Sequence, residues 1–300
     1  MKKLNFLILT ILVLSYACSN HQKSKLHDGD TKESGHACCK ALKPVLKKVG
    51  ETKSDLKVPE SVCYDSIRNI AYVSNIDGES VAKDGKGFIS KIDLQGNIVE
   101  LNWISGLDAP KGMGIYNDLL YVTDVDNVVV IDIKAGKITK KIPVKGTQFL
   151  NDIAIDKAGV VYVTESKQNV VYALKGDVAE LFIKGEGWGF ANGLTIDGDN
   201  LLIGVGNQLK AYSFAKKELT TLVDSSGGID GLNKVKENTY LISDWTGNIS
   251  IIEPAQARII LQKAVDKINA ADMEFVASKN LVLVPTFFDN RVVIYQLDWE

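Results

Sequence analysis

The stretch "NDIAIDKAGVVYVTESKQNVVYALKGDVAELFIK" (151–184) decides the fold. It contains four short runs that are rich in β-branched, aromatic and other apolar residues, which is the composition of β-strands. Glycine or polar residues separate successive runs, as they do in the tight turns of antiparallel hairpins. The stretch therefore predicts a four-stranded antiparallel sheet.

The same four-strand pattern recurs along the chain at intervals of about 40 residues, in six copies. The second strands of the copies are "IAYVSNI" (70–76), "LLYVTDV" (119–125), "VVYVTES" (160–166), "LLIGVG" (201–206), "TYLISDW" (239–245) and "LVLVPTF" (281–287). Repeated units of this kind are typical of β-propeller blades. No run of ten or more residues after Lys57 has convincing helical periodicity. We therefore predict an all-β fold, a six-bladed β-propeller of four-stranded blades.

The sixth copy ends after three strands, at Leu297. The segment "LKPVLKKVG" (42–50) precedes the first copy and can supply the missing fourth strand. Pairing the two ends would close the ring and leave no sheet edge exposed. We expect residues 42–300 to form this propeller, closed by an N-terminal strand. Two packed domains are the alternative, which the even spacing of the copies disfavours.

The first 41 residues have a different character. Lys2 and Lys3 precede an apolar run (6–14) that is too short to span a bilayer, so we predict a signal peptide over residues 1–17. "LSYAC" (14–18) resembles a bacterial lipobox, in which Cys18 is acylated and anchors the chain to a membrane. Cleavage after Ala17 with release is the alternative. Residues 18–41 are polar and read as a flexible lipoprotein tether. We expect an exported lipoprotein at the outer membrane or periplasmic face.

Composition excludes several classes of function. The formal net charge is −2 and no basic patch stands out, which argues against nucleic acid as a partner. The only histidines are His21, His27 and His36, so residues 42–300 lack the histidine of Ser-His-Asp and Cys-His catalysis and of many metal sites. Chemistry in the propeller must use carboxylates, amides, lysine, hydroxyl groups or a hard metal ion.

Two neighbouring cysteines lie in the tether, in the run from His36 to Cys39. This run could form a metal or redox clip. It could also be an adventitious pair, or supply a disulfide partner for Cys63. The three cysteines beyond Cys18 make no complete zinc pattern, which favours the second group of interpretations.

A polar residue opens the first strand of every copy. These residues are Glu60, Lys111, Asn151, Asn192, Asp230 and Asp272, at spacings of 51, 40, 41, 38 and 42. The first strand of a propeller blade is innermost, so we expect the six side chains to converge at one mouth of the central channel. Strand alternation predicts that Asn151 points to the channel axis and that Asp152, which follows it, points away, toward the neighbouring loop.

A confined ring of three carboxylates, two amides and one amine is costly unless a cation neutralises it. Oxygen ligands without histidine or cysteine favour Ca²⁺, with Mg²⁺, Mn²⁺ and Zn²⁺ as alternatives. A polar, water-filled mouth that serves only as a binding surface is the competing interpretation. Asp124, Glu165 and Asp244 end second strands on the same face and would add negative potential and contacts that support the site residues from behind, with solvated loop acids as the alternative.

Over about residues 57–300 the chain resembles the gluconolactonase/regucalcin (senescence marker protein) family of six-bladed propellers. The resembling motifs are "PESVCYD" with Glu60, "NDIAID" with Asn151, "FANGLTID" with Asn192 and "GIDGL" with Asp230. The resemblance implies that these four residues bind a metal ion and that the protein hydrolyses a lactone or related ester. The first motif lacks the family's Gly and Trp, and the catalytic histidines of the phosphatase and paraoxonase-like relatives are absent. The resemblance therefore does not imply which lactone or ester is the substrate.

The remaining residues of the expected site follow from their positions. A metal-bound water, Asp230 or Asp272 would act as base or nucleophile, and Lys111 would bind substrate and stabilise developing negative charge. Trp188 and Phe190, in "KGEGWGFANG" (184–193), would form apolar walls, with simple blade packing as the alternative. The long loop "NIDGESVAKDGKG" (75–87) would be a lid or a surface insertion.

We therefore predict a monomeric metal-dependent hydrolase that acts on a small-molecule lactone or related ester. The alternative is a non-catalytic surface-binding propeller that carries a structural ion.

Overall fold

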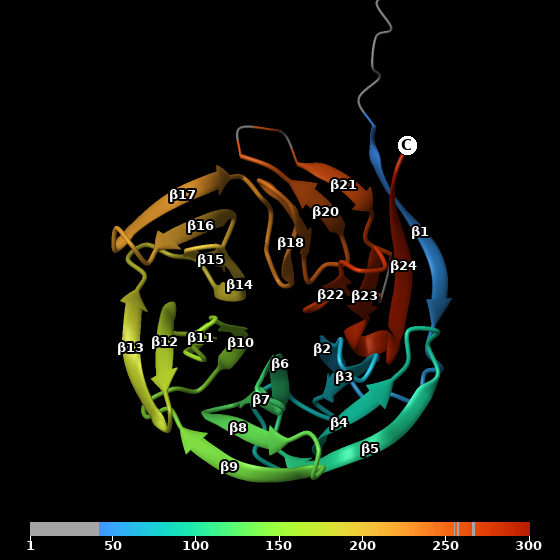
Figure 1. Ribbon diagram of the computed structural model, residues 1–300, viewed down its shortest axis with the longest axis vertical. Coiled ribbons are helices and arrows are strands. Elements are labelled where there is room, and N and C mark those ends of the chain that lie inside the picture. The colour runs from blue at the N-terminus through green and yellow to red at the C-terminus, as the bar shows by residue number, and fades with distance from the viewer. Residues whose placement is uncertain (1–41, 255, 257, 266–267) are drawn as a thin grey trace, which may run out of the picture. The chain divides into compact units, whose positions relative to one another are not determined.

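The computed structural model describes residues 42–300 apart from 255, 257, 266 and 267. The predicted signal peptide, Cys18, the tether and the run from His36 to Cys39 lie outside the described residues. Residues 42–300 form six four-stranded antiparallel sheets arranged as blades around a central axis (Figure 1). The prediction of a six-bladed β-propeller is confirmed. In this part of the chain no helix is long and apolar enough to cross a membrane.

The first three blades follow one another along the chain, each with its first strand innermost. Blade 1 contains β2 (Pro59–Asp65), β3 (Ile70–Asn75), β4 (Gly87–Ile92) and β5 (Ile98–Leu107). Blade 2 contains β6 (Pro110–Tyr116), β7 (Leu119–Asp124), β8 (Asn127–Asp132) and β9 (Lys137–Pro143). Blade 3 contains β10 (Leu150–Ile155), β11 (Val161–Glu165), β12 (Val170–Lys175) and β13 (Val178–Lys184).

The other three blades complete the ring. Blade 4 contains β14 (Ala191–Asp197), β15 (Asn200–Val205), β16 (Gln208–Ser213) and β17 (Glu218–Asp224). Blade 5 contains β18 (Leu232–Lys236), β19 (Thr239–Ser243), β20 (Ile249–Ile252) and β21 (Ile259–Gln262). Blade 6 contains β22 (Glu274–Val276), β23 (Leu281–Pro285), β24 (Val292–Trp299) and β1 (Pro44–Glu51). A short 3₁₀ helix, η1 (Phe287–Asp289), follows β23.

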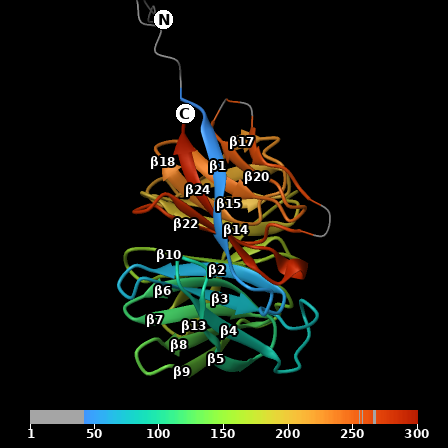
Figure 2. The same ribbon diagram turned by 90° about the vertical axis from the view of Figure 1, so that its right-hand side faces the viewer.

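The two ends of the described chain close the ring, as predicted. Strand β1 pairs antiparallel with β24 from Pro44 opposite Trp299 to Glu51 opposite Val293. Figure 2 shows the two strands side by side at the edge of the ring. Because β1 occupies the outer edge of blade 6, every blade has four strands.

The core consists of apolar layers between neighbouring blades. Between blades 3 and 4, for example, Ala154, Val171 and Leu194 pack together with the buried residues of β15. Both faces of the second strands are covered in this way, which explains why they read as continuous apolar runs rather than alternating ones. Cys63 is buried in the layer between blades 1 and 2 and has no disulfide partner among the described residues.

The inner strands are irregular where they begin. The pairing register of the first strand shifts between Pro59 and Ser61 in blade 1 and between Leu150 and Ile153 in blade 3. The inner strands of blades 2 and 4 show the same irregularity at the same end. An extra residue in one strand bends it and redirects its side chains, and such bulges are common beside functional sites. The predicted mouth residues of blades 1 to 4 lie in these irregular segments.

Candidate functional site

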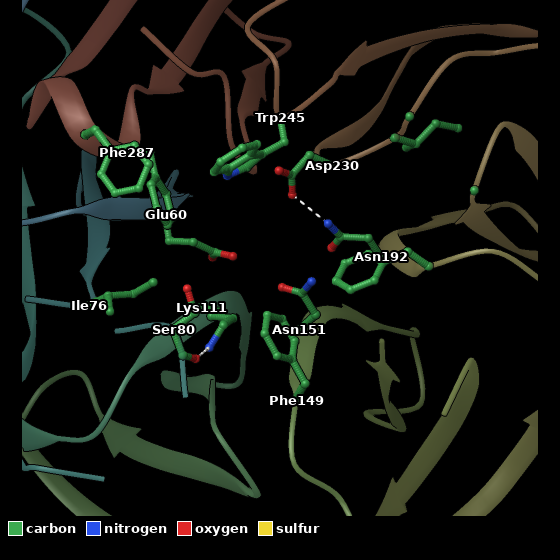
Figure 3. A pocket seen from close by; sticks show the side chains of 15 residues that line it. Glu60, Ile76, Ser80, Lys111, Phe149, Asn151, Asn192, Asp230, Trp245 and Phe287 are labelled. Atoms are coloured by element: carbon green, nitrogen blue, oxygen red, sulfur yellow. Dashed lines mark hydrogen bonds between the residues drawn. The ribbon is translucent and has the colours of Figure 1, made fainter. Parts of the chain in front are cut away.

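A cavity of about 400 Å³ lies at the end of the channel where the inner strands begin (Figure 3). Five of the six predicted ring residues line it: Glu60, Lys111, Asn151, Asn192 and Asp230. They come from five different blades, and each is at least 90% buried. The structure therefore brings together the four residues that the sequence assigned to a metal ion, with Lys111 beside them.

The hydrogen bonds of the two amides turn their oxygens toward the cavity. Asn192 donates from Nδ2 to Oδ1 of Asp230 over 2.7 Å. Asn151 donates from Nδ2 to Oγ of Ser166 over 3.0 Å. Figure 3 shows the carboxylate of Glu60 and the amide of Asn151 pointing into the space between these side chains. Both amide nitrogens are thus used within the protein, while the amide oxygens are left for a ligand.

Two of the buried oxygens have no hydrogen-bond donor within the described structure. They are Oε2 of Glu60 and Oδ1 of Asn192. A buried polar atom without a partner typically costs about 1–3 kcal/mol. Such oxygens are ligands of hard cations such as Ca²⁺. The residues present therefore fit a bound cation better than a closed hydrogen-bond network.

The ligand set is unusual in relying on amides. Among the described residues, no group of three or more His, Cys, Asp or Glu side chains is placed to hold a metal ion. The cavity offers two carboxylates, Glu60 and Asp230, and two amides, Asn151 and Asn192. A site of this composition has few formal charges and depends on the orientation of the amides, which Ser166 and Asp230 fix.

Burial changes the protonation of these groups. It raises the pKa of Glu60 well above its usual range, an effect that the charge of Asp230 increases and that of Lys111 opposes. Burial also raises the pKa of Asp230 to about 7, although the hydrogen bond from Asn192 acts in the other direction. Without a cation, these carboxyl groups therefore retain protons near neutral pH. A bound cation would displace them, so its affinity should increase with pH.

Lys111 connects the cavity to the long loop of blade 1. Its Nζ donates to the backbone oxygen of Ser80 over 2.6 Å and to that of Ala109 over 3.0 Å. Burial lowers the pKa of Lys111, and the nearby Glu60 opposes this effect. An ammonium group has three donors, so one N–H remains beyond these two contacts. The loop lies at the cavity mouth as expected, and its movement as a lid stays a prediction.

Asp272 does not share this cavity. It lies on a second cavity of about 300 Å³, which Asp152 and Glu274 also line. Asp272 forms a parallel bridge with Ser61 rather than with Glu60, and its Oδ2 accepts a hydrogen bond from Oγ of Ser61. The prediction that Asp272 lies at the mouth was therefore wrong, because Asp272 lies level with Ser61, one residue beyond Glu60.

Asp152 points away from the mouth cavity, as alternation predicts, but it lines the second cavity instead of facing the neighbouring loop. Its carboxylate accepts hydrogen bonds from the backbone N–H groups of Ile153 and Leu194. The irregular register of β10 between Leu150 and Ile153 redirects the side chains of this segment. Burial raises the pKa of Asp152 to about 7. Asn151 and Asp152 therefore both face buried cavities, one at the mouth and one beyond it.

The walls of the mouth cavity are aromatic, but only one wall residue was predicted correctly. Phe190 lines the cavity. Trp188 does not, because its indole folds back over Gly185 and packs against the core between blades 3 and 4. Four further aromatic residues line the cavity and were not predicted from the sequence: Phe149, Trp245, Phe287 and Phe288. A signal for two of them was present, since Trp245 and Phe287 lie just after second strands at the same end as the ring.

The acids that end second strands brace the loops instead of facing the cavity. Asp124 accepts hydrogen bonds from the backbone N–H groups of Asp108 and Ala109, just before β6. Glu165 likewise accepts from the backbone of Phe149, just before β10. Asp244 pairs with Arg258 over 2.7 Å. These contacts fix the loops from which Lys111, Asn151 and the aromatic walls project.

The arginines contribute nothing to the cavity. The chain has three, Arg68, Arg258 and Arg291, and each forms ion pairs with neighbouring carboxylates. None of them lines the mouth cavity. Lys111 is thus the only cationic side chain among the described residues that line it.

Neither a protein-family model nor a curated protein matches the sequence. Two solved structures are similar in fold. One is a catalytically inactive histidine-to-alanine variant of virginiamycin B lyase from Staphylococcus aureus with quinupristin, with a TM-score of 0.60, 14% identity, and coverage of 85% of this chain and 100% of that one. The other is a streptogramin B lyase, with a TM-score of 0.62, 12% identity, and coverage of 86% and 98%. At this identity the likeness concerns the fold alone, and the chain is a six-bladed β-propeller that shares the fold of these lyases.

Proposed function

We propose that the protein is a metal-dependent hydrolase of a lactone or related ester, with Ca²⁺ as the metal ion and Mg²⁺, Mn²⁺ or Zn²⁺ as alternatives. One observation carries the proposal. Four side-chain oxygen donors from four blades meet in a cavity, and two of their oxygens are buried without a hydrogen-bond donor. The fold is also similar to that of two lyases, so propellers of this shape can support catalysis.

Glu60, Asn151, Asn192 and Asp230 would hold the ion. When bound there, a divalent cation acts as a Lewis acid toward a carbonyl oxygen. The two amides contribute neutral oxygens, so the site keeps positive charge available for the substrate. The hydrogen bond from Asn192 to Asp230 keeps both side chains in place.

Asp230 is the proposed general base. Burial raises its pKa to about 7 in the absence of a cation, and a bound cation would displace the proton and leave a carboxylate that can accept one from water. In hydrolysis, the oxygen of a water molecule bonds to the carbonyl carbon and the water proton passes to Asp230. The bond from the carbonyl carbon to the ester oxygen then breaks, and the proton goes to the departing oxygen. Asp272 lies outside the mouth cavity, which favours Asp230 over Asp272 for this role.

Lys111 is the proposed donor to the substrate. Two of its three N–H groups are used on backbone oxygens, which orient the third. A donor held in this way stabilises negative charge as it develops on oxygen, because no reorganisation is needed during the reaction.

A non-catalytic binding propeller with a structural ion is the second candidate. The inactive lyase in the comparison lost a histidine, whereas residues 42–300 of this chain contain none. The lyase chemistry of that enzyme therefore has no counterpart among the described residues. We further propose that the protein is exported, anchored through Cys18 at the outer membrane or periplasmic face, and monomeric.

The test measures hydrolysis of a panel of lactones and aryl esters by the full chain, with calcium and after treatment with a chelator. We expect turnover that the chelator removes and that calcium restores. Glu60→Gln should lose both calcium affinity and turnover. Glu180→Gln makes the same change at an exposed position on β13 and should retain both. Full activity of Glu60→Gln, or calcium binding without turnover of any ester, would contradict the hydrolase.

A further inference from the structure

The walls of the mouth cavity differ chemically from its floor. The charged and amide side chains, which are the four proposed ligands and Lys111, surround one space and are each at least 90% buried (Figure 3). Apart from Ser80 and two glycines, the rest of the lining is apolar. It consists of two isoleucines and the aromatic residues Phe149, Phe190, Trp245, Phe287 and Phe288. A ligand that reaches the floor must therefore place most of its surface against aromatic and aliphatic groups.

The aromatic side chains form two groups. Trp245, Phe287 and Phe288 contact one another edge to face, with ring centroids 4.8–6.1 Å apart. Phe149 and Phe190 form the second group, also edge to face, at 5.7 Å. Figure 3 shows Trp245 and Phe149 on opposite sides of the polar side chains. Phe149 and Phe190 each lie two residues before a proposed amide ligand, so the walls adjoin the reacting position.

These rings are available to a ligand. Trp245, Phe288 and Phe190 remain 49%, 60% and 51% exposed, although large apolar side chains are usually covered in a folded domain. Exposed aromatic groups gathered around a cavity mark a binding surface. Phe287, which is buried beneath them, has a φ of 51°, a backbone conformation that bulky residues rarely adopt. Strained backbone of this kind is characteristic of ligand sites.

The same lining disfavours sugar-like and anionic substrates. The hydroxyl groups of a sugar lactone would lose their hydrogen bonds to water, and the aromatic walls offer no replacement. A carboxylate or phosphate group would meet Glu60 and Asp230, with Lys111 as the only cationic lining residue and two of its donors already used. No arginine reaches the cavity to bind such a group.

From these observations we infer that the substrate is an uncharged lactone or ester with an aromatic group beside its carbonyl. The carbonyl faces the polar floor, and the aromatic group lies between Trp245 and Phe288 on one side and Phe149 and Phe190 on the other. The volume of about 400 Å³ suits a small molecule with one or two rings. This inference rests on the proposed site and narrows its substrate class.

Binding of stable analogues tests the inference separately from catalysis. Dihydrocarbostyril is the lactam of the aromatic lactone dihydrocoumarin, and gluconolactam is the corresponding analogue of a sugar lactone. Titration calorimetry on the calcium-loaded full chain should give at least about tenfold tighter binding for dihydrocarbostyril, which equals about 1.4 kcal/mol. Similar affinities for the two lactams, or tighter binding of gluconolactam, would overturn the inference.

Substitutions of the aromatic wall residues then test which side chains cause the preference for the aromatic lactam. Trp245→Ala and Phe190→Ala, on opposite sides of the cavity, should each weaken dihydrocarbostyril binding about tenfold and leave gluconolactam binding unchanged. Trp299→Ala removes a tryptophan that does not line the mouth cavity and should change neither affinity. An equal loss in Trp299→Ala, or no loss in both wall variants, would contradict the assignment of the walls.

Hydrolysis of the parent lactones separates this inference from the proposed function. Preferential binding of dihydrocarbostyril without hydrolysis of dihydrocoumarin would refute the hydrolase and leave the ligand class standing. Equal hydrolysis of dihydrocoumarin and gluconolactone would support the hydrolase and overturn the ligand class.

Discussion

Replacing Asn192 with aspartate would place a second carboxyl group against Asp230. In the protein as it stands, Nδ2 of Asn192 donates to Oδ1 of Asp230 over 2.7 Å. The substitution removes a hydrogen bond to a charged acceptor, which contributes about 1.5–3 kcal/mol. Two unit charges at that separation would repel each other by about 6 kcal/mol at an effective dielectric constant of about 20.

Proton uptake limits the cost of this repulsion. Because burial already raises the pKa of Asp230 to about 7, the two carboxyl groups can share a proton. Holding that proton above the pKa costs about 1.4 kcal/mol per pH unit. We therefore expect Asn192→Asp to lower the free energy of unfolding by about 3 kcal/mol at pH 8 in chelator. The loss should shrink at pH 5, where holding the shared proton costs less.

Calcium should reverse the effect, because a cation between the two carboxylates neutralises both. Urea unfolding at pH 8 and pH 5, in chelator or in excess calcium, measures each part. Asn102→Asp makes the same change at an exposed position on β5 and serves as the control. Wild-type stability of Asn192→Asp in chelator at pH 8 would refute the buried contact. A loss that calcium does not reduce would refute the orientation of Asn192 toward a cation.

Three further predictions concern the channel, the wall and the loops. Burial raises the pKa of Glu274 from 4.5 to about 8, so the folded protein loses stability as pH rises between these values. Urea unfolding should show that the free energy of unfolding of Glu274→Gln rises relative to wild type by up to about 4 kcal/mol between pH 5 and pH 9, and parallel pH profiles of the two proteins would argue against this. Because Phe287 has a φ of 51°, the free energy of unfolding in urea should be about 1 kcal/mol larger for Phe287→Gly than for Phe287→Ala. The reverse order would show that the backbone strain is absent. Asp124→Ala removes the acceptor for the N–H groups of Asp108 and Ala109 and should lower the free energy of unfolding by about 2–3 kcal/mol, more than Asp124→Asn, while equal losses would exclude these bonds.

The fold could be predicted from the sequence because its repeats are visible in it. Second strands such as β7 and β11 are covered on both faces, so each reads as a short apolar run between turn residues. The closing strand could be found by counting, since the last copy lacked one strand. Both features can be read from a single sequence, because they depend on local composition and on the repetition of one unit.

The candidate site could be predicted only in part. Four inner strands carry a recognisable motif around Glu60, Asn151, Asn192 and Asp230, and these residues meet as expected. The sixth inner strand, β22, has only three residues, so its alignment rested on Asp272 alone and slipped by one position. A slip of one residue moves a side chain from the mouth to the interior of the channel.

The aromatic walls could not be predicted, because loop conformation decides them. Trp188 and Phe190 lie two residues apart in one loop, yet the indole covers Gly185 while the phenyl ring lines the cavity. Phe149 and Trp245 belong to blades that are distant in sequence and meet only through closure of the ring. The irregular start of β10 likewise cannot be seen in the residue pattern, so the sequence did not predict that Asp152 would line the second cavity.

A crystal structure of the protein with calcium, with the ion identified by its anomalous scattering, tests the central claim most directly. We expect one ion in the mouth cavity at about 2.3–2.6 Å from oxygens of Glu60, Asn151, Asn192 and Asp230. We also expect the ion to be absent from crystals of Glu60→Gln grown under the same conditions. An empty mouth cavity at saturating calcium, or an ion bound only in the second cavity beside Asp152, would contradict it.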